Sequence, residues 1–274
     1  MATPDALLWS TALRGECQEG TSEPPMPYLI RRLRDTLRTR LGGPSDADVV
    51  GAPGSIQLRN VTAGYGGPPV FVGFNLHINP GEFVYLVGPS GAGKSTLIRL
   101  LYGTVRAQDG WVLVDGIAVH RLQSWQMDTV RRRVGCVFQA YELLPHLTAL
   151  ENVLLPLQLA HPRMLNARSL AAEALELVGL KAKMHELPGT LSGGQQQRVA
   201  VARAIAHQPR VLLADEPTGN VDSRASAEIM ELFAQLNEMG STVVMATHDE
   251  FVLSTYPARV VPLQQQPDVL DVAS

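Results

Sequence analysis

The sequence predicts an α/β fold with a mixed core sheet, because short apolar runs of strand length alternate with stretches of helical pattern. Phe83 to Val87 is predicted as a buried strand, followed by a glycine-rich turn and then by an apolar helical segment. A second apolar run, Val211 to Ala214, ends in two acidic residues, and a third, Thr242 to Ala246, ends shortly before a histidine. Polar residues just beyond buried strands are typical of the ligand-binding edge of such a sheet.

The glycine-rich turn fits the phosphate-loop pattern G-x-x-x-x-G-K-[ST]. Glycines allow consecutive backbone N–H groups to turn towards a phosphate chain, and the N-terminus of the following helix adds its dipole. Lys94 is expected to reach the β and γ phosphates, and Ser95 to bind a Mg²⁺ ion. The expected nucleotide-binding residues here are Gly88, Pro89, Ser90, Gly91, Ala92, Gly93, Lys94, Ser95 and Thr96.

Two acids, Asp215 and Glu216, follow the second apolar run. In a parallel sheet their strand ends beside the phosphate loop, so the carboxylates are expected at the phosphate site. Asp215 is suited to hold Mg²⁺, directly or through water. Glu216 is suited to orient and deprotonate an attacking water. Such positioning is the main contribution that a protein makes to phosphoryl transfer. The alternative is an ordinary solvated acid at a strand end.

From Ile56 to Leu263 the motifs resemble those of ABC-type ATP-binding subunits. Leu191 to Gln195, with the sequence LSGGQ, is similar to the signature of that family, and Asn220 to Asp222 is similar to the loop after its acidic strand. The resemblance implies a P-loop NTPase of ABC type, with an antiparallel β subdomain and a helical subdomain, that binds ATP and Mg²⁺ and hydrolyses ATP. Three further positions match single family residues: Gln139, His248 and Tyr65.

The resemblance assigns a role to each of these residues. Gln139, after the predicted strand Val134 to Phe138, would sense Mg²⁺ and the lytic water. His248 would contact the γ phosphate and lock Glu216 and the water in place. Tyr65 would stack on adenine, although an aromatic residue in a glycine-rich turn is equally consistent with surface packing. The expected catalytic residues are Glu216, His248 and Gln139, and the expected metal ligands are Ser95, Gln139 and Asp215.

The signature segment predicts a second phosphate site. Ser192, Gly193, Gly194 and Gln195 precede the predicted helical run Gln196 to His207, so they offer a hydroxyl group, backbone amides and a helix N-terminus to an anion. Because the segment is far along the chain from the phosphate loop, it need not belong to the same site. The resemblance implies a head-to-tail homodimer, in which each ATP lies between one subunit's phosphate loop and its partner's signature. The expected nucleotide contacts therefore include Ser192, Gly193, Gly194, Gln195 and Asp222.

Composition limits the alternatives. The 274 residues are 45% hydrophobic with a net charge of −3, which gives no electrostatic basis for binding nucleic acid. Apolar runs stay far below the roughly 20 residues that span a bilayer, so a membrane-spanning partner is expected to be another polypeptide. Cys17 and Cys136 have no metal-ligand spacing and form no disulfide framework, which favours a reducing cytoplasm. Only 51 residues separate Gln139 from Leu191, which leaves no room for the long coiled coil of chromosome-organising ATPases.

The chain is predicted to divide into an N-terminal extension (1–55), an ATP-binding domain (56–263) with a helical subdomain at about 140–195, and a C-terminal tail (264–274). Within the extension, residues 28–41 carry leucines at four-residue spacing beside five arginines. This pattern predicts a basic amphipathic helix that lies on an anionic inner-membrane surface or on the partner. The alternative to such a helix is a flexible leader, or translation that starts at Met26.

Several segments most resemble the cell-division branch of the family, the FtsE type, among them residues 83–95, 131–139 and 243–249. That resemblance implies a peripheral ATPase on the cytoplasmic face of the inner membrane. Closure of its dimer would move an FtsX-like membrane subunit and regulate peptidoglycan hydrolysis. Residues 148–153 and 215–222 also resemble the ATPases of lipoprotein-releasing and macrolide exporters, which remain the alternative.

Overall fold

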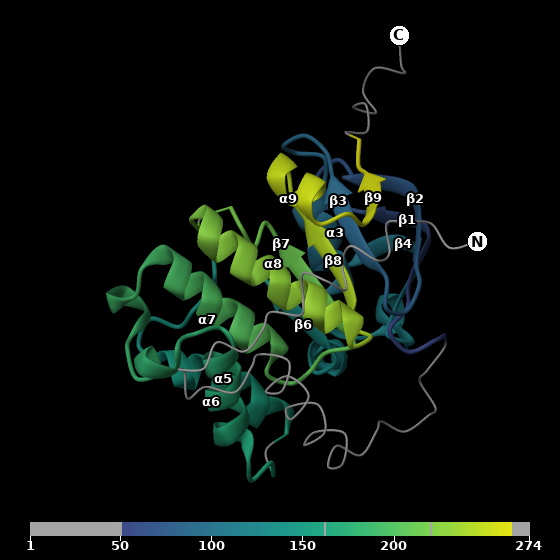
Figure 1. Cartoon of the computed structure of the whole chain (residues 1–274). Helices are drawn as coiled ribbons and strands as arrows, with labels where there is room; N and C mark the ends of the chain where they lie inside the picture. Colours follow the sequence, from purple (N-terminus) through teal and green to yellow (C-terminus); the bar gives the residue numbers. More distant parts are fainter. Residues whose placement is uncertain (1–50, 162, 220, 265–274) are drawn as a thin grey trace, which may run out of the picture.

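A computed structural model describes residues 51–161, 163–219 and 221–264, which form two β-sheets and a layer of helices (Figure 1). The helix expected at 28–41, Asn220 and the tail after 264 lie outside the described residues. Among the helices that are described, none is both long and apolar enough to cross a membrane.

The first sheet is antiparallel, in the order β2-β1-β4-β5. In β1 the buried positions Ile56 and Leu58 alternate with more exposed ones, and the alternation resumes out of phase at Val61 and Ala63. The phase changes because Asn60 adopts a left-handed backbone (φ 52°) where the register with both neighbouring strands shifts, which is a β-bulge. The strands are β1 (Ile56–Ala63), β2 (Phe71–Ile78), β4 (Ala107–Val114) and β5 (Ile117–Ala118).

The second sheet has five strands in the order β6-β7-β8-β3-β9, and its strand pairs are all parallel. Among the described strands, antiparallel pairing is thus confined to the first sheet and the core sheet is parallel; the predicted α/β fold is confirmed. The strands are β3 (Phe83–Val87), β6 (Val134–Val137), β7 (Val211–Asp215), β8 (Thr242–Ala246) and β9 (Arg259–Pro262). β6 ends one residue before the predicted Phe138; β3 and β8 have the predicted bounds.

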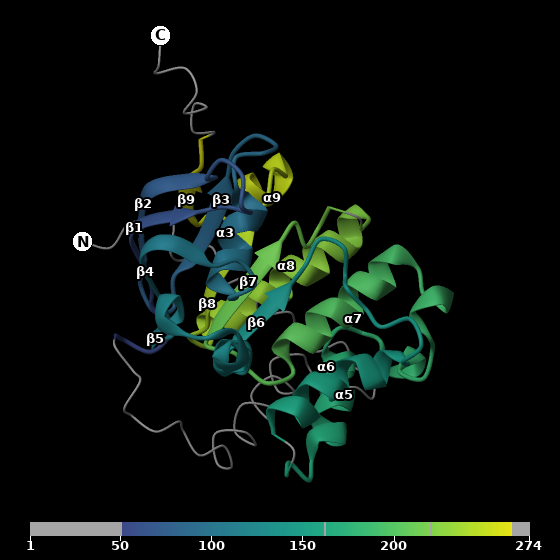
Figure 2. The same cartoon turned by 180° about the vertical axis from the view of Figure 1, so that it is seen from behind.

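Both faces of the parallel sheet are covered, which explains why its strands are apolar without alternation. In β8, Val244 and Ala246 join a core shared with α3 (Lys94–Leu101) and the antiparallel sheet, whereas Val243 and Met245 join a core shared with the other helices. Helix α3 therefore lies between the two sheets (Figure 2). Helix α8 (Ser223–Glu238) covers the other face, and α4 (Asp128–Arg131) and α9 (Glu250–Thr255) are short connections.

The helical layer consists of α5 (Ala149–Ala160), α6 (Ala167–Leu177) and α7 (Gly193–Ile205). The predicted start of α7 at Gln196 is wrong. Ser192 is its N-cap: the Ser192 hydroxyl accepts from the Gln195 amide, and the Gln195 side chain accepts from the Ser192 amide. This capping box begins the helix at Gly193. Because α7 packs on α5, α6 and β6, the helical layer also extends beyond the predicted boundary at 195.

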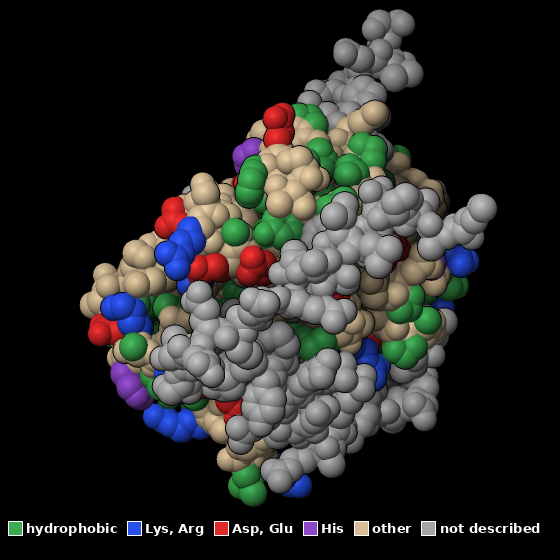
Figure 3. Space-filling model, viewed as in Figure 1, with side chains coloured by type: hydrophobic (Ala, Val, Ile, Leu, Met, Phe, Trp, Pro, Cys, Tyr) green, Lys and Arg blue, Asp and Glu red, His purple; other side chains and the backbone are tan. Residues whose placement is uncertain are grey.

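A salt bridge links α7 to α8 at the surface. Glu228 of α8 binds Arg198 of α7 at 2.7 Å and Arg224 of its own helix at 3.2 Å. Figure 3 shows acidic and basic side chains interspersed on the left of this face, over the helical layer and the start of α8.

The contacts of the folded domain begin a few residues before Ile56. The Gly54 amide donates to Asp115 Oδ1 at 2.7 Å, and the Thr242 hydroxyl donates to the Gly54 carbonyl at 2.6 Å. Ser55 is buried as well. These contacts attach the segment before β1 to both sheets.

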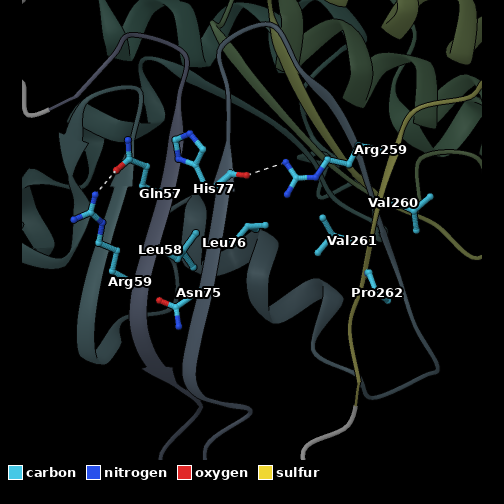
Figure 4. Close-up of a pocket in the computed structure, with 10 residues that line it drawn as sticks. All are labelled: Gln57, Leu58, Arg59, Asn75, Leu76, His77, Arg259, Val260, Val261 and Pro262. Carbon is cyan, nitrogen blue, oxygen red and sulfur yellow. Dashed lines mark hydrogen bonds between the residues drawn. The ribbon is translucent and has the colours of Figure 1, made fainter.

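Arg259 of β9 joins the two sheets at another point. Its guanidinium donates to the His77 carbonyl of β2 at 2.9 Å (Figure 4). It also pairs with Glu82 at 2.8 Å. A cavity of about 500 Å³ lies between β1, β2 and β9. None of the residues predicted to bind nucleotide or metal lines this cavity.

Candidate active site

The phosphate loop connects β3 to α3, as predicted. Gly91 (φ 80°) and Gly93 (φ 93°) have left-handed backbones, which non-glycine residues rarely adopt. At Gly93 a Cβ atom would also lie 2.6 Å from Phe71 Cζ, so a side chain there would require the loop to move. Because Gly93 precedes α3 and has no side chain, it leaves the first-turn amides of the helix free of a side-chain cap.

Lys94 is mostly buried at the start of α3. Its ammonium group donates to the carbonyls of Gly88 and Pro89 at 2.7 and 3.1 Å. These bonds hold the positive charge inside the loop, where an ammonium group attracts phosphate. The position agrees with the predicted contact to a nucleotide.

Asp215 and Ser95 come together beside this loop. Asp215 ends β7 and is 3% exposed; burial raises the pKa of its carboxyl group, while a hydrogen bond from Ser95 opposes that rise. Its Oδ1 atom is buried and has no hydrogen-bond partner among the described residues. A carboxylate and a hydroxyl oxygen are ligands that Mg²⁺ prefers. The pair therefore fits the predicted metal.

Glu216 meets both other predicted catalytic residues. Gln139 Nε2 donates to Glu216 Oε2 at 2.9 Å, and His248 Nδ1 lies 3.0 Å from Glu216 Oε1. The three residues follow β6, β7 and β8, whose carboxyl ends meet at one edge of the parallel sheet. The backbone of Glu216 is left-handed (φ 49°), and its amide donates to the Ala246 carbonyl at 3.0 Å. Strain of this kind is held in place by the surrounding structure and is frequent at active sites.

The signature residues lie in another part of the fold, at the start of α7. Among the described residues, the side chains of Ser192 and Gln195 bond with each other's backbone amides, and the N-terminus of α7 is exposed. Asp222, also predicted to contact nucleotide, is the N-cap of α8, where its Oδ1 accepts from the Ala225 amide at 2.8 Å. Within one chain the structure therefore brings together the phosphate loop, the acids, Gln139 and His248. Among the described residues, Ser192 has no hydrogen bond to any of them.

Tyr65 lies in the turn after β1 and is 59% exposed. Its hydroxyl accepts a hydrogen bond from Arg99 Nη1 of α3 at 3.4 Å, which keeps the ring near the helix that follows the phosphate loop. Its open face is accessible for stacking. Both alternatives, adenine stacking and surface packing, remain compatible with this position.

Three residues that hold loops around the site were not predicted from the sequence. Arg203 of α7 bonds two carbonyls just after Gln139, Gln197 of α7 bonds the Pro217 carbonyl just after Glu216, and Asn152 of α5 bonds the segment before its own helix. Each partner is a backbone group, so no complementary residue type in the sequence signals the contact. Gln197 and Asn152 are buried, which is unusual for these residue types, but only the structure shows their burial.

Comparison with known proteins agrees with this geometry. Residues 71–219 match the ABC transporter family. The cell division ATP-binding protein FtsE of Haemophilus influenzae is 45% identical over 214 residues, which cover 77% of this chain and 97% of that protein. FtsE of Bacillus subtilis is 42% identical, covering 76% and 92%. The lipoprotein-releasing system ATP-binding protein LolD of Bacteroides fragilis is 44% identical, covering 71% and 91%.

Solved structures give the same result. A dimeric ATP-binding cassette in a post-hydrolysis state, bound to ADP and Pi, superposes with a TM-score of 0.72 at 38% identity. The superposition covers 77% of this chain and 97% of the cassette. A dimeric bacterial ABC transporter cassette also has a TM-score of 0.72, at 40% identity, and covers 77% and 94%. The chain therefore belongs to the ABC transporter family and is an ATP-binding, ATP-hydrolysing cassette.

Proposed function

We propose that this ATPase is the FtsE-like subunit of a membrane complex in bacterial cell division. The observation that carries the proposal is the match to FtsE proteins of several bacteria at 42–45% identity over 91–97% of their length. In the proposed complex the chain is peripheral, on the cytoplasmic face of the inner membrane. It moves an FtsX-like membrane subunit and so regulates peptidoglycan hydrolysis.

Hydrolysis in this proposal uses the residues that meet at the sheet edge. Lys94 and the amides of residues 88–95 bind the phosphates of ATP. Ser95 and Asp215, with Gln139, would hold Mg²⁺, and the ion would supply positive charge against the charge that develops on the phosphate oxygens. Glu216 accepts a proton from the water that attacks the γ phosphorus, and ADP leaves with the β–γ bridging oxygen. The hydrogen bonds of Glu216 with Gln139 and His248 fix the carboxylate for that step.

We further propose that two copies pair head to tail, so that Ser192 and the start of α7 of one copy bind the ATP held by the other. Two observations support this arrangement. The signature helix start is exposed, and within the described residues the side-chain bonds of Ser192 and Gln195 are those of the cap. The two solved structures with a TM-score of 0.72, both of one cassette, are dimers. In this arrangement each chain contributes half of two sites.

The membrane subunit is proposed to dock on the segment between Gln139 and α5. Leu144 in this segment is 38% exposed. Asn152 of α5 holds the segment in shape: its amide Nδ2 donates to the carbonyls of Leu144, Leu147 and Thr148 at 3.1, 2.9 and 3.0 Å, and its Oδ1 accepts from the Leu144 amide at 2.8 Å. One buried side chain thus fixes a surface loop that carries an exposed apolar residue.

Replacing Asn152 by Ala is expected to uncouple the ATPase from its membrane subunit. Loss of these bonds should lower the free energy of unfolding by about 1–3 kcal/mol and let the docking segment move. Basal ATP hydrolysis should persist, whereas stimulation or co-isolation with the membrane subunit should fall. Asn237→Ala is a matched control, because Asn237 Nδ2 also bonds two carbonyls, of Gly81 and Ser241, away from this segment. If both variants lose the membrane subunit equally, the docking role is wrong.

The cell-division proposal is tested by isolating the full-length chain with its membrane partner. Expressed with an affinity tag in its own cells, the chain should recover an integral membrane protein with a large external loop, and its depletion should block division. Recovery of a lipoprotein-releasing permease would instead favour the alternative, which is supported by the 44% identity to LolD. A chain that recovers no membrane protein would contradict both.

A further inference from the structure

The loop after Gln139 has an unusual backbone. Tyr141 (φ 60°) and Glu142 (φ 51°) are consecutive non-glycine residues in the left-handed region. Each such residue costs about 1–2 kcal/mol relative to an ordinary conformation, so two in a row persist only where other contacts hold them. The local amide bonds, from Tyr141 to the Phe138 carbonyl and from Glu142 to the Ala140 carbonyl, make a tight turn directly around Gln139.

Arg203, near the end of α7, contacts this turn from another part of the chain and holds its backbone in place. Its Nη2 donates to the Tyr141 carbonyl at 2.6 Å and its Nη1 to the Glu142 carbonyl at 2.5 Å. The two donors of a planar guanidinium thereby bind two adjacent carbonyls of the strained turn, a geometry that a lysine ammonium group does not reproduce. Burial lowers the pKa of Arg203, while Tyr102 and Glu142 nearby favour its charged form.

A second bond runs from the same helix to the other catalytic loop. Gln197 is buried, and its Nε2 donates to the Pro217 carbonyl, the residue after Glu216, at 2.7 Å. Helix α7 therefore holds the loops of both Gln139 and Glu216. Their side chains meet at 2.9 Å, the usual donor–acceptor distance of an N–H···O hydrogen bond, so the contact depends on both loops staying in place.

We propose that Arg203 is a positioning residue for ATP hydrolysis, which fixes the Tyr141–Glu142 turn so that Gln139 is held against Glu216. The inference rests on the proposed roles of Gln139 and Glu216. Helix α7, which Ser192 caps, thus connects the proposed signature contact to the loops of Gln139 and Glu216.

The test compares Arg203→Lys with Arg198→Lys in the full-length chain. Both arginines are on α7, but Arg198 pairs with Glu228 at the surface, away from the catalytic loops. Arg203→Lys is expected to lower kcat for ATP by about tenfold or more while the Kd for ATP stays within about twofold, because the turn positions the attack and does not bind the phosphates. Arg198→Lys should leave both unchanged. Normal kcat in Arg203→Lys, or a loss of ATP affinity as large as the loss of kcat, would overturn the proposal.

A double-mutant cycle with Gln139→Ala separates positioning from general destabilisation. If Arg203 acts through Gln139, then Arg203→Lys should cost little further activity in the Gln139→Ala background, whereas additive losses would overturn the proposal. Glu142→Pro provides a second test that leaves Arg203 unchanged. The Glu142 side chain is exposed, and proline cannot adopt its φ, so this variant should reproduce the selective loss of kcat; normal turnover would contradict the proposal.

The same assay distinguishes failure of the inference from failure of the site. If Glu216→Gln abolishes hydrolysis and Arg203→Lys does not lower it, the positioning role alone is wrong. If Glu216→Gln hydrolyses ATP normally, the proposed roles of Glu216 and Gln139 are wrong as well.

Discussion

Replacing Glu216 by Gln is expected to abolish ATP hydrolysis while leaving ATP binding intact. The amide keeps the size of the carboxylate and its contact distance to Gln139 and His248, but it cannot accept a proton from water. Loss of a general base lowers kcat by about 10²–10⁴-fold, so the enzyme should stop after ATP has closed the dimer. Phosphate release measures the rate, and size-exclusion chromatography with ATP and Mg²⁺ should detect the trapped dimer.

Lys94→Ala is the control for this variant, because it removes a phosphate contact instead of the base. It should weaken ATP binding itself and give no trapped dimer. A Glu216→Gln protein that turns over ATP at a near-normal rate with its membrane subunit present would contradict the assignment of Glu216.

Replacing Ser192 by Asp is expected to prevent ATP-driven dimer formation without unfolding α7. Asp is as good an N-cap as Ser, so the helix start at Gly193 should survive. In the proposed dimer, however, a carboxylate would face the phosphates held by the other chain and repel them. ATP binding by the monomer should stay close to normal, whereas hydrolysis should fall by about 10²-fold or more. Ser192→Thr, which retains the hydroxyl and the cap, should behave like the wild-type chain.

Mixing variants tests the head-to-tail geometry directly. In a mixed dimer of Lys94→Ala and Ser192→Asp chains, both defects fall in one composite site and the other site is intact. Each variant alone should be inactive, and the mixture should recover at most one working site per dimer. No recovery on mixing, or normal dimer formation by Ser192→Asp, would mean that the signature does not complete the partner's site.

Local patterns in the sequence were enough to predict much of this fold. The strands Phe83–Val87 and Thr242–Ala246 have the predicted bounds, because buried parallel strands are continuous apolar runs. The phosphate loop is equally local, since the left-handed φ of Gly91 and Gly93 is a property of glycine itself. The start of α7 was also readable: Ser192 and Gln195 have the spacing of a capping box, and the prediction of Gln196 overlooked that signal.

The sequence by itself determined the α/β class, the family motifs and the residues that we propose to hydrolyse ATP. Only the tertiary structure decided how those residues meet. The contacts of Glu216 with Gln139 and His248 span 77 and 32 positions of the chain, and those of Arg203 with Tyr141 and Glu142 span 62 and 61. Neighbouring residues set a local pattern because they interact along the backbone. A long-range contact instead depends on strand order and helix packing. When the acceptor is a backbone carbonyl, the type of the accepting residue gives no indication of the bond, because every residue has such a carbonyl.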